Sequence, residues 1–297
     1  MELQRVNDKD GLQPAERLWT PWRMAYVGGE TAAPGCVFCN CRTDHDDARN
    51  LVIHRGEAAF VMMNLYPYNT GHLMIVPNDH KDDLAALRPE TRAEIAELSA
   101  SFCTGLRLAL RCEGFNTGMN LGDVAGAGIA DHLHQHIVPR WRGDANFMPI
   151  IGSTKVLPEL IPSTYAKIRA DVARQKSKAN ELVFVPITPD GMQVALLDGK
   201  LPRVDVESGL SAWTGATAPL QSWFASYSLI GWAGPSSTSE DGSAPPTLAI
   251  SVTLDHRAPA SLRLHSIDAA LDTLTGRPRD ALAACTRRGF AAGGELA

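Results

Sequence analysis

Three histidines stand at every second position near the middle of the chain, in the segment His132-Leu133-His134-Gln135-His136. In an extended strand successive side chains point to opposite faces, so this spacing places the three imidazoles on one face. Imidazole is the side chain most easily made a base, a nucleophile or a metal ligand near neutral pH. Because the whole chain holds nine histidines, three within five residues indicate a site.

A second group of reactive side chains is the close pair Cys36 and Cys39, in a C-x-x-C pattern. The hydrophilic start of the chain carries no signal-peptide core, so we expect a cytoplasmic, reducing environment. There the pair indicates either a metal site or redox chemistry.

Composition sets the class of protein. The 297 residues are 44% hydrophobic and 21% charged, which is typical of a globular chain of one or two domains. The formal net charge of −5 argues against a general affinity for nucleic acid or for anionic membranes. No apolar run reaches the length that spans a bilayer. These bounds agree with a soluble enzyme for which we expect no membrane partner and no general affinity for nucleic acid.

The elements that must hold the histidines are mainly strands. Segments 58–64, 71–77, 115–121 and 132–138 have strand patterns, and a helix starts at Pro89 and stops at Gly114. Residues 122–128, between the last two strands, are too rich in glycine for either regular element. This order predicts an α+β fold, an antiparallel sheet with one long helix.

A second, smaller α+β domain is predicted after residue 178, so that the domains are 1–178 and 179–297. A helix around 157–176 leads into a polar linker, strands are expected at 181–187, 192–198 and 247–254, and a short helix at 267–274. Segment 234–246 is rich in Ser, Gly and Pro, which predicts a loop. The opening of this part faintly resembles a Nudix domain. Segment 210–232 has no acidic residue, however, so we expect no magnesium catalysis there.

Four phrases of the first part resemble the histidine-triad (HIT) family, and in particular its bacterial diadenosine-tetraphosphate phosphorylase branch: RLWTPWRMAYV, MNLYPYNTGHLMIVP, GFNTGMNLG and ADHLHQHIVPRWRGDANFMPIIG. The resemblance implies a HIT-like fold and cleavage of dinucleoside polyphosphates by phosphorolysis or hydrolysis. It makes His134 the nucleophile that forms a nucleotidyl-histidine, with His136 orienting it or stabilising charge. The alternatives are a nucleotidyltransferase or hydrolase acting on another adenylated substrate, and a nucleotide-binding sensor with little turnover.

The same resemblance implies a set of binding residues. It makes Asn64 the residue that hydrogen-bonds the ribose hydroxyls. Four neighbours either form the wall of the base pocket or belong to the hydrophobic core: Phe60, Leu65, Tyr66 and Pro67. The candidates for phosphate contacts are Asn120, Gly122, Gly126, Gly128, Arg140, Ser153 and Lys155. Gly128 departs from the family pattern, because many members have Gln or Ser at this position. The expected partners are a nucleotide and inorganic phosphate, and a homodimer is compatible with the sequence.

The resemblance also implies a structural zinc ion on Cys36, Cys39, His80 and His132, since two thiolates and two imidazoles make a closed tetrahedral site. Three alternatives remain open: a redox-active C-x-x-C, Cys41 in place of one thiolate, and His54 or His45 in place of His80. For His72 a packing or polar pocket role is expected rather than metal binding.

Overall fold

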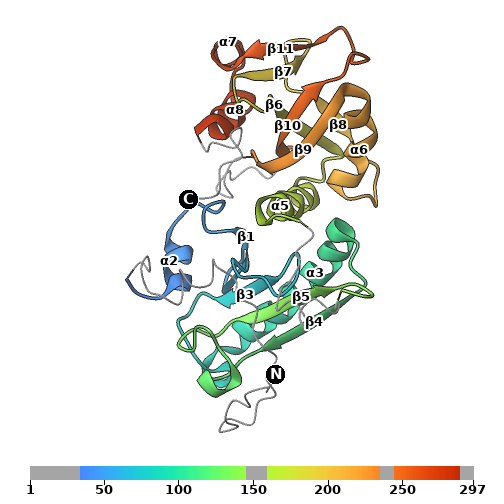
Figure 1. The fold of residues 1–297 in the computed structure, drawn as a ribbon. Helices are drawn as coiled ribbons and strands as arrows, with labels where there is room; N and C mark the ends of the chain where they lie inside the picture. Colours follow the sequence, from blue (N-terminus) through green and yellow to red (C-terminus); the bar gives the residue numbers. More distant parts are fainter. Residues whose placement is uncertain (1–33, 145–158, 235–243, 288–297) are drawn as a thin grey trace, which may run out of the picture.

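The computed structural model describes residues 34–144, 159–234 and 244–287 (Figure 1). It contains two β-sheets, one toward each end of the molecule, with helix α5 (Ile161–Ser177) between them. Ser153, Lys155 and most of the loop predicted at 234–246 lie outside the described residues. Within the described ranges no helix is both long and apolar enough to cross a membrane.

The first sheet has five antiparallel strands in the order β1-β2-β3-β5-β4. Their bounds are β1 Val52–Arg55, β2 Ala59–Met63, β3 Leu73–Pro77, β4 Gly114–Met119 and β5 Gln135–Arg140. Every residue of β2 and β3 is buried, because helix α3 (Pro89–Leu110) covers one face of the sheet and helix α2 (Val37–Thr43) packs on the other. The short helices η1 (Leu84–Ala86) and η2 (Asp123–Ala125) lie in the connections.

Several predicted boundaries in this part are wrong, including the start of the strand predicted at 71–77, which is Leu73. The strand predicted at 132–138 is β5, 135–140, because residues 132–134 lie beyond the sheet, where the Leu133 N–H donates to the Lys81 carbonyl (2.6 Å). The strand predicted at 115–121 ends at Met119. Helix α3 starts at Pro89 as predicted but ends at Leu110 rather than at Gly114, since Arg111 adopts the left-handed conformation (φ 53°) that closes it.

The second sheet has six strands, in the order β11-β7-β6-β10-β9, with β8 paired to β6. Strands β6 and β10 run parallel, whereas the other pairs are antiparallel. The bounds are β6 Glu181–Ile187, β7 Gln193–Leu197, β8 Arg203–Asp205, β9 Phe224–Trp232, β10 Thr247–Leu254 and β11 Leu262–Ser266. Helices α6 (Ala212–Trp223), α7 (Ile267–Thr273) and α8 (Arg277–Arg287) complete it. The predicted fold class, an antiparallel α+β sheet with a long helix followed by a second α+β part, is confirmed.

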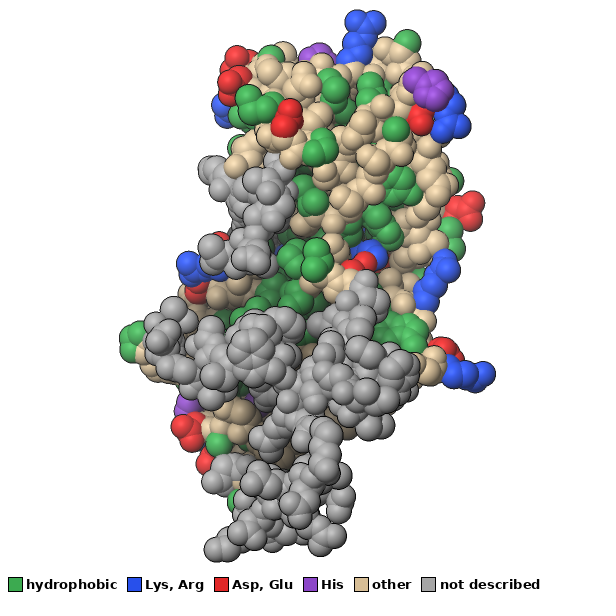
Figure 2. Space-filling model, in the orientation of Figure 1, with side chains coloured by type: hydrophobic (Ala, Val, Ile, Leu, Met, Phe, Trp, Pro, Cys, Tyr) green, Lys and Arg blue, Asp and Glu red, His purple; other side chains and the backbone are tan. Residues whose placement is uncertain are grey.

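Helix α5 joins the two parts. Towards the first sheet, the Tyr165 hydroxyl donates to the Val52 carbonyl (3.0 Å) and the Arg169 guanidinium donates to the Ile53 carbonyl (2.6 Å). Towards the second sheet, the Ser163 hydroxyl donates to the Leu229 carbonyl (2.8 Å) on β9. One hydrophobic cluster therefore runs from the first sheet through α5 into the second. Figure 2 shows hydrophobic side chains in this middle band and charged ones of both signs scattered around its rim.

Candidate active site

The three histidines lie where β5 begins, on the face of the first sheet that carries α2. His136 is opposite Met74 of β3 and Gly118 of β4 in the sheet register. The His134 ring lies 5.0 Å from the ring of Phe38 on α2. Gln135 points the other way and donates to the Ser99 hydroxyl of α3 (2.6 Å). The alternation of the segment thus gathers the imidazoles on one side.

His134 is held in one tautomer by the backbone. Its Nδ1 lies 3.0 Å from the carbonyl oxygen of His132, and because a carbonyl can only accept, Nδ1 carries the ring proton. Its Nε2 therefore keeps the free lone pair. The ring is only 6% exposed, and this burial lowers the pKa of His134, so that the imidazole is neutral near pH 7. A neutral ring with a free Nε2 is the form that a nucleophile needs.

His136 is oriented by a chain of hydrogen bonds. The Tyr68 backbone N–H donates to Nδ1 of His72 (3.0 Å), which leaves the His72 proton on Nε2. That Nε2 lies 2.9 Å from Nδ1 of His136 and donates to it, so the His136 proton is on Nε2. The His134 and His136 rings are 4.8 Å apart. Burial, and then the neighbouring His134, lower the pKa of His136 to about 4. The arrangement thus places the free lone pair on Nε2 of His134 beside the N–H donor on Nε2 of His136.

Sequence reasoning missed three parts of this arrangement. It gave His72 a polar pocket role but not its bond to His136. It also missed Phe38, whose ring contacts both His132 (5.4 Å) and His134 (5.0 Å). Tyr68, whose ring lies 4.7 Å from that of His72, was missed as well. The antiparallel pairing of segments 71–77 and 132–138 was the signal that could have linked His72 to His136.

Four candidate metal ligands converge beside the histidines. One ligand atom from each of Cys36, Cys39, His80 and His132 lies within 4.8 Å of the others. Nδ1 of His132 is 3.3 Å from the Cys36 sulfur, and Nδ1 of His80 is 3.4 Å from the Cys39 sulfur. His132 donates from Nε2 to the Pro77 carbonyl (2.9 Å), which frees Nδ1 to face the sulfurs. Two thiols and two imidazoles with this convergence fit a closed tetrahedral metal site.

The alternative ligands lie elsewhere. Cys41 is buried and its thiol donates to the Asn50 side-chain oxygen (3.7 Å). His45 is exposed and is not part of the converging group. His54 lies on the opposite face of the sheet, where its ring is 6.1 Å from that of Phe102 on α3. The structure therefore assembles the set with His80 and not one of its substitutes.

The glycine-rich connection between β4 and β5 runs next to the triad in sequence. Gly122 (φ 80°) and Gly126 (φ 83°) adopt left-handed conformations that favour glycine, whereas Gly128 does not. The Asn120 side-chain amide donates to the Gly126 carbonyl (3.4 Å), which links the two sides of the loop. All four residues are half-exposed or exposed. Their contact with phosphate stays a prediction.

The structure does not bring Arg140 to the triad. Its guanidinium pairs with both carboxylate oxygens of Asp144 (2.6 and 2.7 Å) and donates to the Asn116 side-chain oxygen (2.8 Å). It lies four residues beyond His136, which is about 13 Å along a strand.

Asn64 also has partners within the protein. Its amide lies 3.3 Å from Nδ1 of His72, and its oxygen accepts from the Tyr66 N–H (2.9 Å). The ribose role of Asn64 therefore stays a prediction. Of its neighbours, Phe60 belongs to the buried cluster under α2, whereas Leu65 is 52% exposed.

Comparison with known proteins gives a consistent picture. The HIT domain model matches residues 46–143. An "AP-4-A phosphorylase" of Mycobacterium tuberculosis is 40% identical over 178 residues, which cover 57% of this chain and 89% of that protein. "Protein hit" of Bacillus subtilis is 24% identical over 38% of this chain and 76% of its own.

Among solved structures, a Zn-bound histidine triad family protein from Mycobacterium smegmatis matches with a TM-score of 0.41 and 26% identity, over 48% of this chain and 97% of that one. The family assignment follows from sequence. A relative 40% identical is covered over 89% of its length, and the matched domain contains all three histidines, so the chain belongs to the HIT (histidine triad) family.

Proposed function

We propose that the chain cleaves dinucleoside polyphosphates such as diadenosine tetraphosphate, with His134 as the nucleophile. The observation that carries this proposal is the His134 tautomer, with the proton on Nδ1 and a free lone pair on Nε2. The name of the 40% identical relative, an AP-4-A phosphorylase, supports the substrate class.

In the first step Nε2 of His134 attacks a nucleotide α-phosphorus. The phosphorus–nitrogen bond forms while the bond to the bridging oxygen breaks, and its electron pair leaves with the nucleoside polyphosphate. The neutral ring attacks without charge repulsion and becomes cationic. The His132 carbonyl, which already accepts from Nδ1, stabilises that charge without a proton transfer. The Nε2–H of His136 is the neighbouring donor for the departing oxygen.

In the second step an acceptor attacks the nucleotidyl-histidine and restores the neutral ring. With inorganic phosphate the products from diadenosine tetraphosphate are ADP and ATP, and with water they are AMP and ATP. We propose phosphate as the preferred acceptor.

The decisive experiment incubates the full chain with diadenosine tetraphosphate, with and without phosphate, and separates the products by ion-exchange chromatography. ADP with ATP identifies phosphorolysis, and AMP with ATP identifies hydrolysis. If neither product pair forms, the proposal is rejected in favour of a sensor or of an enzyme for another adenylated substrate.

The nucleophile is tested by substitution. His134→Ala should lower the rate by more than about a thousandfold, because the covalent step is lost. His256→Ala is the matched control, since that ring is 86% exposed on the second part of the chain. A stopped reaction of the natural chain should contain protein heavier by one nucleotidyl group, and His134→Ala should not. A His134→Ala variant with near-normal rate would remove this residue from the mechanism.

We also propose that the converging Cys36, Cys39, His80 and His132 hold one zinc ion in a structural role. Thiolate and imidazole are the ligands that zinc prefers, and a set of four leaves no open coordination position for substrate. Metal analysis of purified protein should give about one zinc per chain. Protein that is fully active and free of zinc would reject the site and favour a C-x-x-C disulfide.

A further inference from the structure

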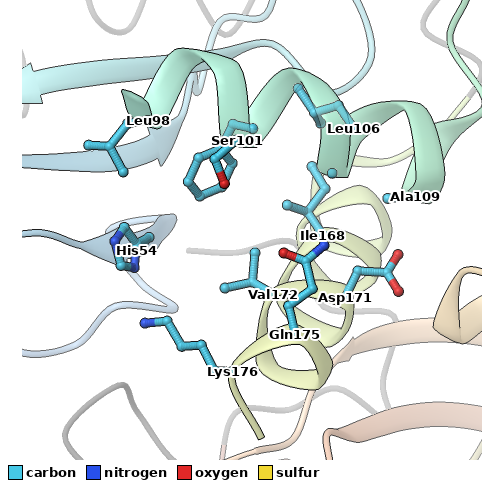
Figure 3. Close-up of a pocket in the computed structure, with 12 residues that line it drawn as sticks. His54, Leu98, Ser101, Leu106, Ala109, Ile168, Asp171, Val172, Gln175 and Lys176 are labelled. Carbon is cyan, nitrogen blue, oxygen red and sulfur yellow. The ribbon is translucent and has the colours of Figure 1, made fainter. Parts of the chain in front are cut away.

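A cavity of about 230 Å³ lies between α3 and α5, beside the end of β1. It is on the face of the first sheet opposite the three histidines, because His54 at its rim contacts Phe102 of α3. Leu98, Phe102, Ile168 and Val172 supply apolar walls. Figure 3 shows side chains from both helices and from β1 around this space.

Small residues on α3 keep the cavity open. Ser101, Gly105 and Ala109 recur at every fourth position, on the side of the helix that lines it. Such residues usually allow two helices to pack closely, yet here a space remains. A Cβ added at Gly105 would meet its nearest neighbour, the Gln175 amide nitrogen, only at 3.9 Å, which is an ordinary contact. A glycine inside a helix destabilises it by about 0.5–1 kcal/mol relative to alanine. Gly105 is therefore less stabilising than alanine would be, although a larger side chain would fit there.

One end of the cavity is polar and positively charged. Nδ1 of His54 is buried and has no hydrogen-bond partner within the described part of the chain. Lys176 extends its ammonium towards this end, beside His54 (Figure 3). No ion pair joins Lys176 to another of the described residues. Burial, and then the nearby Arg169, lower the pKa of Lys176.

The other charged groups near Lys176 each have at least one partner within the protein. The Asp47 carboxylate, which raises the pKa of Lys176, accepts from the Arg55 guanidinium (2.9 Å). Arg169 donates to the Ile53 carbonyl (2.6 Å). Asp171 turns its carboxylate to the opposite side of the cavity (Figure 3), where it accepts from the Ala212 N–H (2.8 Å). Burial and then Lys176 lower the pKa of His54 to about 4, so its ring is neutral near pH 7. Among the described residues that line the cavity, Lys176 is thus a cation without an ion pair and can meet a ligand.

We propose that this cavity binds a small organic anion, namely a carboxylate on an aromatic or branched aliphatic body. The carboxylate would pair with the Lys176 ammonium and accept from a proton on Nδ1 of His54. The body would lie against Phe102, Leu98 and Val172. The volume is below the roughly 300–1,000 Å³ typical of sites for drug-sized ligands, so the ligand is a single ring or a short chain.

The test uses the full chain and benzoate as the probe, with benzamide as the neutral analogue and benzylamine as the cationic one. Methyl NMR signals of Ile168 and Val172 are followed up to about 10 mM, the range in which so small a ligand is expected to bind. Benzoate should shift these signals saturably, benzamide more weakly, and benzylamine not at all. Lack of saturable shifts with benzoate, or equal binding of benzamide, would overturn the proposal.

Substitutions locate the binding. Gly105→Met should abolish it by filling the space, whereas Gly105→Ala should leave it intact. Lys176→Met should weaken benzoate binding roughly threefold to fivefold, the strength of a partly exposed ion pair, and Lys178→Met is the matched control. Binding that survives Gly105→Met, or that responds equally to both lysine substitutions, would place benzoate elsewhere and overturn the proposal. Neither Gly105 nor Lys176 belongs to the candidate active site, so this result is independent of the proposed activity.

Discussion

At the scale of single residues, the backbone decides which nitrogen of each histidine is available. The carbonyls of Pro77 and His132 accept from His132 and His134, and the Tyr68 N–H donates to His72. Each of these groups can only accept or only donate, so each fixes one tautomer. Three chemically identical side chains thereby become suited to the three roles proposed for them: a metal ligand, a nucleophile and a hydrogen-bond donor.

His72 tests the proposed mechanism, because in that mechanism it would act on the reaction only through its bond to His136. His72→Leu should lower kcat about tenfold to a hundredfold, the equivalent of one lost buried hydrogen bond, and should leave KM nearly unchanged. His72→Gln keeps both an acceptor for the Tyr68 N–H and a donor for His136, so it should restore most of the rate. Steady-state kinetics of the two variants make the comparison. Equal loss in both would mean that His72 only fills space.

At the scale of elements, α2 is the segment whose stability we expect to depend on the proposed metal site. It has seven residues, too few for a helix to be stable by itself in water. Phe38 and Cys41 anchor it in the buried cluster under the sheet. Cys36 lies at its N-terminus and Cys39 in its first turn, so a metal ion would tie the helix to His80 and to His132 just before β5.

Loss of the metal should therefore loosen α2 before it alters the chemistry. Cys36→Ser, or a zinc chelator added to the natural chain, should lower Tm by roughly 5–10 °C. Cys103→Ser is the control, because that thiol on α3 is not part of the converging group. Thermal unfolding followed by circular dichroism measures the effect. A Tm that is the same with and without chelator would contradict a structural metal.

At the scale of the whole molecule, the sequence predicted element bounds best where a local pattern fits only one kind of element. Strands β6 and β10 have the predicted bounds, because each is an apolar run flanked by polar or turn residues. Helix α2 was missed, since a short cysteine-rich segment has no helical period and is held by contacts distant in sequence. The metal residues could be grouped from a family resemblance, but the His72–His136 bond depends on strand register.

The division into domains at residue 178 stays a prediction, and α5 is the element on which it depends. Tyr165 and Arg169 bind the backbone of β1, whereas Ser163 binds β9. Because one buried cluster continues through α5, we expect the two sheets to influence each other's stability. A cut after Lys178 would expose the apolar side of α5 that faces the second sheet.

Asp171 offers a test of that junction through pH. Its Oδ1 accepts from the Ala212 N–H at the start of α6, but its Oδ2 is buried without a hydrogen-bond partner among the described residues. Burial raises the pKa of Asp171 to about 6, above its ordinary value of 3.8. The folded chain then binds this proton more tightly than the unfolded one. Stability from this group is full below about pH 4 and is lost as the pH rises through 6.

Asp171→Asn should remove this dependence, because an amide resembles the protonated acid and can still accept from the Ala212 N–H. The free energy of unfolding of the variant, relative to the natural chain, should rise by about 2 kcal/mol between pH 4.5 and 7.5. Urea unfolding at several pH values measures the difference, in which all other titrating groups cancel. Asp272→Asn, an exposed change on α7, is the control variant. Parallel pH profiles for Asp171→Asn and the natural chain would show that the buried carboxylate does not affect how the two parts hold together.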